Sequence, residues 1–359
     1  MKKLIFFGFF ILMIFSVNCS KEKWQGKIYK EQGVTVTESR GAGLWGDKVN
    51  EKVTFKESLS FGKETGEEFL VFHSELDLTV DSELNIYVLD IKNHRLLKFD
   101  KEGNFIWKAG RKGQGPGEFL NPFNVKISPS AEICVLDYPS HIHLFDNHGK
   151  YMRTINLEGR CSNFYFLPDG RLLISRTTRG QMGIAAEYYS IEGELLEKFP
   201  DEYRYGPKMP SWAGGGFGGG YRFLEGKIYM ISPDKYEIRE YDLEGKLLGK
   251  IKRDFDLLPP ETRMIRKDIG MMMASNVMGP CFLYKKKMLL NMLLLVERKA
   301  EEEPVIHLFL DFFNERGQFL GSYRLPEQTW LNAIDHENNF YFVQKEPFPR
   351  VIRSTLDID

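Results

Sequence analysis

The chain has little excess charge of either sign, since 49 Lys and Arg stand against 50 Asp and Glu in 359 residues. A balance this close to zero gives no electrostatic reason to expect a nucleic-acid partner. Long apolar runs are scarce as well. The apolar stretch at residues 4–17 is shorter than the roughly 20 residues that a bilayer-spanning helix needs. The sequence therefore argues against nucleic-acid binding and against a permanent membrane helix.

Cysteine is also rare, with four in the whole chain. Apart from Cys19 there are only Cys134, Cys161 and Cys281, an odd number without close spacing. This pattern excludes a disulfide framework and a CxxC zinc site. Cys134 stands in an apolar run and is interpreted as a small buried hydrophobe, while a single Cys134–Cys161 bridge stays open.

The first residues have the features of a targeting signal. Two lysines precede the apolar stretch 4–17, which is typical of a secretory signal peptide, here residues 1–18. The tetrapeptide that ends at Cys19 resembles a bacterial lipobox, so Cys19 is predicted to be lipidated and residues 20–23 to form a tether. We expect an extracytoplasmic, lipid-anchored protein of the cell envelope; the alternative is a soluble secreted or periplasmic protein.

A short phrase recurs after residue 50: an aromatic residue, a small polar one, two variable residues, glycine, one more residue and an apolar one. Its five glycines are Gly103, Gly149, Gly193, Gly245 and Gly317. The first intervals are close to the roughly 40–50 residues of a four-stranded propeller blade, and the later ones are longer. Runs rich in β-branched and aromatic residues precede each phrase, which indicates strands joined by tight turns.

The end of the chain supplies only three strands of a sixth unit, and residues 53–61 offer a strand to complete it. Pairing of the two ends would close the ring and remove its open edges. We therefore predict an all-β, six-bladed β-propeller with four-stranded antiparallel blades over residues 51–359, the last blade being closed by an N-terminal strand. Residues 19–50 would form the tether and a short hairpin region. A closed propeller of this kind is expected to be a monomer.

Residues 110–119, Asn121-Pro122 and the segments 87–90 and 93–95 are similar to NHL-type repeats. The whole layout resembles a family of bacterial six-bladed β-propeller lipoproteins. The resemblance implies a signal peptide, a short N-terminal hairpin region and then the propeller. It implies little about function, because propellers host unrelated activities that are grafted on site by site.

The three long connections, residues 110–120, 201–220 and 253–278, all run from an outer strand to the next inner strand. Such connections emerge on the same face of a propeller, and loops on a rigid scaffold often carry function. The segment 203–221 is rich in glycine and aromatic residues, so Tyr205, Trp212, Phe217 and Tyr221 are the predicted ligand-binding residues. A short helix with a methionine-rich side is predicted over residues 259–273.

Signals for chemistry are weak. His141 and His143 lie on one side of a strand, but nothing nearby has the spacing of a third metal ligand, so a plain surface pair is favoured. Asp90 and Asp137 follow apolar strands and are interpreted as turn residues that bind their own backbone. We predict no catalytic residue, metal ligand or cofactor.

The sequence thus favours a non-enzymatic, membrane-tethered module that binds an envelope protein, peptide or glycan through its insertion-bearing face. The alternative is a propeller hydrolase or lyase with a metal in the central channel. That alternative requires inner-strand residues such as Asp77 or Asn124 to converge on the axis.

Overall fold

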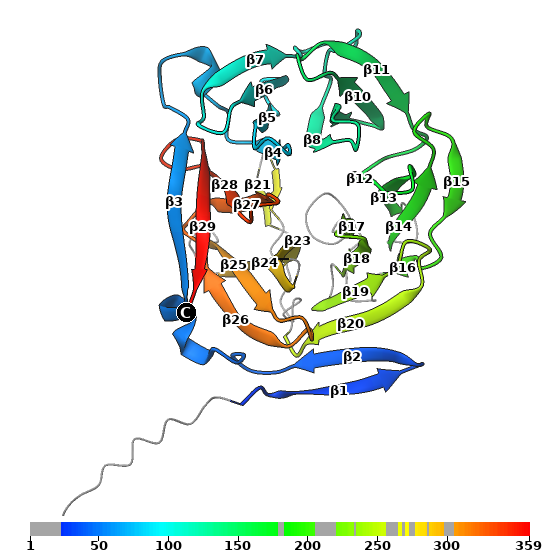
Figure 1. Ribbon diagram of the computed structural model, residues 1–359, viewed down its shortest axis with the longest axis vertical. Coiled ribbons are helices and arrows are strands. Elements are labelled where there is room, and N and C mark those ends of the chain that lie inside the picture. Colours follow the sequence, from blue (N-terminus) through cyan, green and yellow to red (C-terminus); the bar gives the residue numbers. More distant parts are fainter. Residues whose placement is uncertain are drawn as a thin grey trace, which may run out of the picture.

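The computed structural model describes residues 23–178, 183–204, 220–232, 235–255, 265–267, 270–272, 277–285, 287–297 and 305–359. Within these ranges, antiparallel strands form six blades around a common axis (Figure 1). None of the helices in these ranges is long and apolar enough to cross a membrane. Cys19 and the predicted signal peptide lie outside them.

Each blade runs from an inner strand near the axis to an outer strand at the rim. Blade 1 is β4 (Leu76–Val80), β5 (Ile86–Asp90), β6 (Arg95–Phe99) and β7 (Phe105–Ala109); blade 2 is β8 (Pro122–Ile127), β9 (Ile133–Asp137), β10 (His141–Phe145) and β11 (Tyr151–Asn156). Blade 3 is β12 (Asn163–Phe166), β13 (Leu172–Thr178), β14 (Gly183–Tyr189) and β15 (Leu195–Lys198), with β16 (Tyr203–Arg204) also pairing with β14. Blade 4 is β17 (Gly220–Leu224), β18 (Lys227–Ile231), β19 (Glu237–Tyr241) and β20 (Leu247–Arg253); blade 5 is β23 (Val277–Tyr284), β24 (Met288–Glu297), β25 (Val305–Phe313) and β26 (Phe319–Arg324). Blade 6 is β27 (Thr329–Ile334), β28 (Phe340–Gln344), β29 (Arg350–Ile358) and β3 (Val53–Phe61).

The two ends of the chain meet in blade 6. Strand β3 pairs antiparallel with β29 from Val53↔Ile358 to Phe61↔Val351, so an N-terminal strand supplies the outer strand of the last blade. The six-bladed fold with four-stranded antiparallel blades and an N-terminal closing strand is therefore confirmed. Because the ring is closed, every blade packs between two neighbouring blades.

The recurring phrase forms the turn between the third and the outer strand of blades 1 to 5. All five glycines have positive φ, from 71° at Gly317 to 94° at Gly193, a conformation that a Cβ atom disfavours. In blade 1, the Asp100 carboxylate accepts hydrogen bonds from the backbone N–H groups of Glu102 and Asn104, at 3.0 and 2.8 Å. The phrase therefore encodes a side-chain-stabilised hairpin, as the sequence predicts.

Burial falls from the middle of a blade to its rim. All five residues of β5 and all five of β9 are buried, because both faces of these strands pack against neighbouring blades. The outer strand β7 alternates between partly buried and exposed residues, as expected when one face meets solvent. The core is therefore divided among the spaces between blades rather than gathered at one centre.

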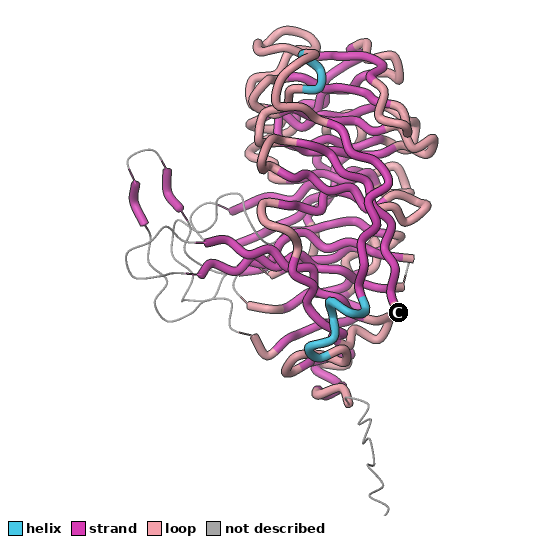
Figure 2. The backbone as a smooth tube through the Cα atoms, turned by 90° about the vertical axis from the view of Figure 1, so that its left-hand side faces the viewer, coloured by secondary structure: helices cyan, strands magenta, loops and turns pink. Residues whose placement is uncertain are grey.

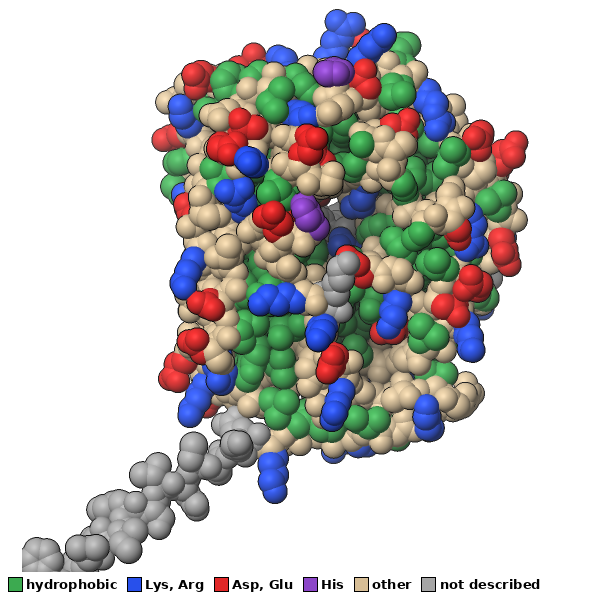
Figure 3. Space-filling view, in the orientation of Figure 1, with side chains coloured by type: hydrophobic (Ala, Val, Ile, Leu, Met, Phe, Trp, Pro, Cys, Tyr) green, Lys and Arg blue, Asp and Glu red, His purple; other side chains and the backbone are tan. Residues whose placement is uncertain are grey.

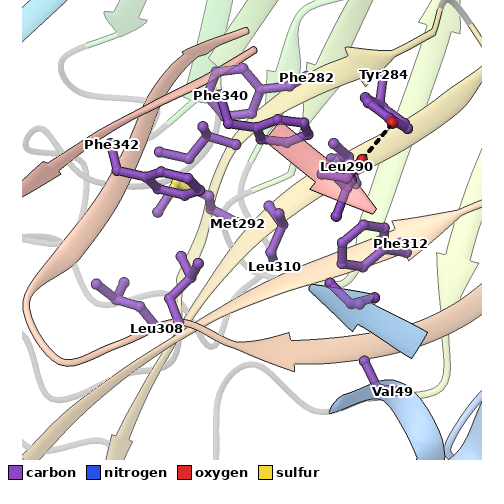
Figure 4. Close-up of a cluster of buried hydrophobic side chains, with 14 of the residues drawn as sticks. Val49, Phe282, Tyr284, Leu290, Met292, Leu308, Leu310, Phe312, Phe340 and Phe342 are labelled. Carbon is purple, nitrogen blue, oxygen red and sulfur yellow. Dashed lines mark hydrogen bonds between the residues drawn. The ribbon is translucent and has the colours of Figure 1, made fainter. Parts of the chain in front are cut away.

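One such space lies between blades 5 and 6 (Figure 4). Leu290 and Leu310 from blade 5 pack there with Phe340 and Phe342 from blade 6. The Tyr284 hydroxyl at the edge of this cluster donates to the carbonyl of Leu356 at 3.1 Å, which ties the closing blade to its neighbour.

The N-terminal segment forms a hairpin of β1 (Gly26–Glu31) and β2 (Val34–Ser39), as predicted. The hairpin lies along the rim of blade 4, where β2 pairs in parallel with β20 and extends that sheet to six strands. The chain then crosses blade 5, where Trp45 packs against Phe312 with ring centroids 5.3 Å apart. It passes through a 3-10 turn (Gly46–Lys48) and α1 (Val49–Lys52) into β3, so one N-terminal segment links blades 4, 5 and 6.

The ring has two different faces. The face that carries the turns from first to second strand and from third to outer strand is called the turn face here. The opposite insertion face carries the connections between blades, including residues 62–75 with a 3-10 turn (Glu68–Leu70), 110–121 and 157–162. On that side, β21 (Ile265–Lys267) and β22 (Gly270–Met272) stand off the ring (Figure 2).

The helix predicted over residues 259–273 is wrong where the structure describes it. Strands β21 and β22 pair antiparallel, with Lys267 opposite Gly270. A glycine in a helix interior costs about 1 kcal/mol relative to alanine, so Gly270 weakens the helix that the apolar spacing indicates.

Ser39 provides a test of how the hairpin is attached. Its side chain is 1% exposed, and its hydroxyl oxygen accepts from Trp24 Nε1 at 3.0 Å and from the Phe319 backbone N–H at 3.1 Å. Ser39→Ala would leave that buried N–H without a partner and should lower the free energy of unfolding by about 1–3 kcal/mol in urea denaturation. Ser60→Ala, at an exposed position of β3, should change it by less than about 0.5 kcal/mol. Equal effects of the two substitutions would contradict this attachment.

Candidate functional site

Of the predicted ligand-binding residues, Tyr205, Trp212 and Phe217 lie outside the described residues. Tyr221 is described, at the start of β17, and is 1% exposed. Its ring packs against Phe199 with centroids 4.9 Å apart, and its hydroxyl donates to the carbonyl of Asp201. Tyr221 therefore secures the connection between blades 3 and 4 from inside the core, and its ring does not lie on the surface.

The connection 110–121 on the insertion face has a defined structure. Phe119 is fully buried and fixes one end of the loop, while Glu118 accepts the backbone N–H of Gly115 at 2.9 Å and pairs with Arg111 at 2.6 Å. The Arg111 side chain remains 81% exposed. The loop therefore presents a guanidinium to solvent from a rigid base.

Asp137 holds this same loop to blade 2. Its carboxylate accepts the backbone N–H groups of Leu120 at 2.7 Å and Asn121 at 2.5 Å, and it lies 3.5 Å from His143 Nε2. Burial alone would raise the pKa of Asp137, but the hydrogen bonds from His143 and from the two N–H groups outweigh it and hold the pKa below its ordinary value. Asp137 thus binds the incoming connection, and its interpretation as a residue that binds its own turn is wrong.

Asp90 has the equivalent place in blade 1. It accepts the backbone N–H of His73 at 3.2 Å, which anchors the connection 62–75, and it forms a buried ion pair with Arg95 at 2.7 Å. Only its bond from the Asn93 side chain, at 2.8 Å, belongs to the turn that follows it. The carboxylates at the ends of β5 and β9 therefore position the loops of the insertion face.

His141 and His143 lie on one side of β10, with ring centroids 6.3 Å apart, as predicted, but His143 is buried beside Asp137, so the prediction of a surface pair is wrong. Each ring nitrogen Nδ1 has a neighbouring partner at 2.8 Å, Asn156 Oδ1 for His141 and Thr154 Oγ1 for His143.

The three cysteines Cys134, Cys161 and Cys281 are free, buried thiols, so Cys134 and Cys161 are not bridged. Burial raises the pKa of both Cys161 and Cys281 to about 12, which makes these thiols poor nucleophiles.

A second set of polar residues gathers at the axis. The inner strands of five blades contribute a group that is called the axial cluster here: Asp77, Asn124, Lys126, Tyr165, Arg222 and Asn332. The turn face is hollowed at the middle of the ring, and Lys or Arg side chains are visible in the hollow (Figure 3). The axis is therefore polar, in contrast to the apolar space between blades 5 and 6.

Asp77 organises one side of the axial cluster. Its Oδ2 accepts Asn124 Nδ2 and the Val125 backbone N–H, both at 2.9 Å, and its Oδ1 has a longer contact of 3.5 Å with Asn332 Nδ2. The Val125 N–H lies on the open edge of β8, where no further strand pairs with it. One carboxylate therefore joins the inner strands of blades 1, 2 and 6.

Three oxygen atoms of the axial cluster are shielded from solvent and have no hydrogen-bond partner within the described ranges: Asn124 Oδ1, Asn332 Oδ1 and the Tyr165 hydroxyl. Between the inner strands of blades 4 and 5, Arg222 Nη1 donates to the carbonyl of Cys281 at 3.3 Å. Lys126 Nζ lies 5.2 Å from the centroid of the Tyr165 ring. The axial cluster thus combines neutral acceptors that lack a donor with two cations.

The electrostatics of the axial cluster follow from its burial. Desolvation lowers the pKa of Lys126 to about 8; Asp77 opposes this shift and Arg222 adds to it. Burial raises the pKa of Tyr165 to about 12, and the field of Arg222 reduces that rise. A lysine with a pKa this close to neutrality is typical of functional sites, although structural networks also shift pKa values.

The metal-dependent alternative can be judged from these residues. Asp77 and Asn124 do converge on the axis, as that hypothesis requires. However, Asp77 is the only carboxylate of the axial cluster, and Lys126 and Arg222 would repel a divalent cation. The residues described show no group of three or more His, Cys, Asp and Glu that could hold a metal ion. The axial cluster is therefore better suited to an anionic ligand than to a metal.

The sequence did not single out four residues of the axial cluster: Lys126, Tyr165, Arg222 and Asn332. The available signal was alternation, because Asn124 and Lys126 in β8 lie two positions apart in a strand that is otherwise mostly apolar, and so do Asn163 and Tyr165 in β12. Only the closed ring shows that these positions share one axis.

The comparisons with known proteins agree with this fold. A family model described as "6-bladed beta-propeller" matches residues 57–205, from the closing strand through blade 3. Human NHL repeat-containing protein 3 is 29% identical over 157 residues, which are 40% of this chain and 45% of that protein. The Drosophila melanogaster protein brain tumor is 33% identical over 79 residues, 21% of this chain and 8% of that protein. The chain thus spans less than half the length of these curated relatives.

Among solved structures, a member of the DUF4221 family from Bacteroides vulgatus has a TM-score of 0.59 and 14% identity, covering 86% of this chain and 99% of that chain. A Bacteroides fragilis protein has a TM-score of 0.60 and 11% identity, covering 90% of this chain and 99% of that chain. At such identities the likeness concerns the fold alone. The chain is a six-bladed β-propeller protein. Its repeats are similar to NHL repeats, as predicted.

Lys126→Met tests the charge state of the axis. In the folded chain the pKa of Lys126 is about 8 rather than 10.5, so between these values the unfolded chain binds more protons and the stability of the wild type rises with pH. Below pH 8 the charged lysine costs folding on the order of 2–3 kcal/mol, a cost that methionine lacks. We expect the stability gain of Lys126→Met to be largest at pH 7 and to shrink toward pH 10 in urea unfolding.

The matched control is Lys150→Met, at an exposed position. Its difference from the wild type should not change between pH 7 and pH 10. A pH-independent difference for Lys126→Met would show that its ammonium is not desolvated.

Proposed function

We propose that this protein is a membrane-tethered, extracytoplasmic binding module whose insertion face binds a protein, peptide or glycan of the cell envelope. The observation that carries the proposal is the concentration of long connections on that face, with β21 and β22 standing off it (Figure 2). The turn face, by contrast, carries the tight turns of the repeat.

The described part of the insertion face supports a binding role because its loops are held in place. Asp90 and Asp137 anchor two of the connections, and the loop 110–121 presents the exposed Arg111. Loops that are fixed on a rigid scaffold can bind with little loss of conformational entropy. Glycine and aromatic residues in the segment 205–219 would add adaptable apolar contacts.

The position of the N-terminal hairpin supports tethering from the side. The described chain begins at Lys23 and enters the hairpin at the rim of blade 4. Cys19 precedes Lys23 by four residues, and an extended segment of that length spans at most about 14 Å. A lipid on Cys19 would hold this rim beside the membrane and leave the insertion face open to the envelope.

Cys19→Ala tests the tether. The mature variant carries no acyl chains, so it should leave the membrane fraction and appear in the soluble fraction. The measurement is fractionation with detection of lipid on the intact protein by mass spectrometry. Cys281→Ala, which removes a buried thiol, should remain with the membrane. An unmodified Cys19 on a protein that still sediments with membranes would contradict lipidation.

Replacing Tyr205, Trp212 and Phe217 by serine tests the binding face. In-cell cross-linking followed by affinity capture should recover a specific partner with the wild type and about 30-fold less with this variant, since an aromatic anchor is worth about 2 kcal/mol or more. The matched control replaces Ile28, Met152 and Leu196 by serine, three apolar side chains that are about half exposed on other strands. Equal recovery with both variants would contradict binding through this segment.

A further inference from the structure

The axial cluster has a feature that the insertion face does not explain. Asp77 Oδ2 accepts Asn124 Nδ2 at 2.9 Å, and Asn332 Nδ2 lies 3.5 Å from Asp77 Oδ1, so the carboxylate favours the donor end of each amide on its side. The Oδ1 atoms therefore lie at the other ends of the amides. Neither Oδ1 has a donor within the described residues, and both are shielded from solvent.

Unpaired acceptors in such a position are costly. Each buried carbonyl oxygen without a donor destabilises the fold, and the Tyr165 hydroxyl adds a third unpartnered group at 7% exposure of its residue. A bound molecule with N–H or O–H donors would remove this cost. The two Oδ1 atoms therefore point to a ligand that carries hydrogen-bond donors.

The two cations of the axial cluster select for negative charge. Among the ion pairs of the described residues, none involves Lys126 or Arg222; Arg222 donates Nη1 to a backbone carbonyl at 3.3 Å, and its guanidinium lies 5.2 Å from the centroid of the Phe282 ring. Both side chains are partly exposed, as are Asn124 and Asn332. A carboxylate is the natural partner for a guanidinium beside an ammonium.

We propose that the axial cluster binds a small carboxylate that also carries N–H or O–H donors. Lys126 and Arg222 hold the carboxylate, and the Oδ1 atoms of Asn124 and Asn332 accept the donors. A bare anion such as sulfate would leave both amide oxygens unpaired, and a cation would meet two positive charges. This site goes beyond the proposed function, because it lies on the axis and not in the loops of the insertion face.

Four probes separate the two halves of this recognition: alanine and glucuronate, which have both a carboxylate and donors, acetate, which has no donor, and glucose, which has no carboxylate. The full chain is titrated with each by calorimetry. Alanine, glucuronate or both should bind, at least tenfold more tightly than acetate and glucose. Failure of alanine and glucuronate alike would mean that water satisfies the amide oxygens, and it would overturn the proposal.

Two substitutions test the named contacts. Lys126→Met should weaken binding of the carboxylate about 10- to 100-fold, the effect of losing a charged hydrogen bond, and Asn332→Leu should weaken it without changing the small affinity for acetate. Lys150→Met is the control, because that exposed side chain lies outside the axial cluster. Binding that survives Lys126→Met, or that Lys150→Met reduces as much, would contradict the assignment.

Near-UV circular dichroism and the urea midpoint of each variant show whether it has kept its fold. The variant without Tyr205, Trp212 and Phe217 separates this site from the insertion face. It should bind the small carboxylate as the wild type does even where it fails to capture the envelope partner. Loss of carboxylate binding in that variant would place the site in the loops and overturn its assignment to the axis.

Discussion

The pairing of β3 with β29 is the constraint on which the rest of the molecule depends. The C-terminal part of the chain supplies three strands of blade 6, β27, β28 and β29, and leaves the place of the outer strand open. The N-terminal strand β3 supplies the missing strand, and the hairpin that precedes it extends blade 4. Because strands from both ends of the propeller pair in one sheet, two neighbouring blades cannot separate unless the whole closed ring is distorted.

Closure of the ring also leaves backbone groups at the axis unpaired, and residues of the axial cluster bind some of them. Each inner strand has an open edge whose backbone groups no neighbouring strand can pair. Side chains from adjacent blades take that role: Asp77 accepts the Val125 N–H, Ser175 accepts the Tyr221 N–H at 3.3 Å, and Arg222 donates to the Cys281 carbonyl. Polar residues at the axis are therefore required by the architecture before any ligand is considered.

The repeat could be predicted from the sequence because it is written locally. Gly103 and its four counterparts need positive φ, and that need appears at the same place in each phrase. The roles of Asp90 and Asp137 could not be predicted, since their partners lie 16 or 17 residues earlier in the chain. The axial cluster was harder still to predict, because its residues come from five blades. In the sequence each of them looks like an ordinary polar residue of a strand. Gly270 shows the opposite failure, in which an apolar spacing that suits a helix occurs in a β-ribbon.

Some polar groups at the axis are required by the architecture, whereas others destabilise the fold without a structural role. The architecture requires a carboxylate such as Asp77 and a donor such as Arg222 at the axis. It does not require Lys126, whose charge is desolvated, or amide oxygens that no donor reaches within the described residues. A fold selected for stability alone would replace these groups with apolar side chains, like those that fill the space between blades 5 and 6. Within the described residues, three of the six shielded polar atoms without a partner lie in the axial cluster, and together with Lys126 and Arg222 they match one kind of ligand, which supports a binding site there.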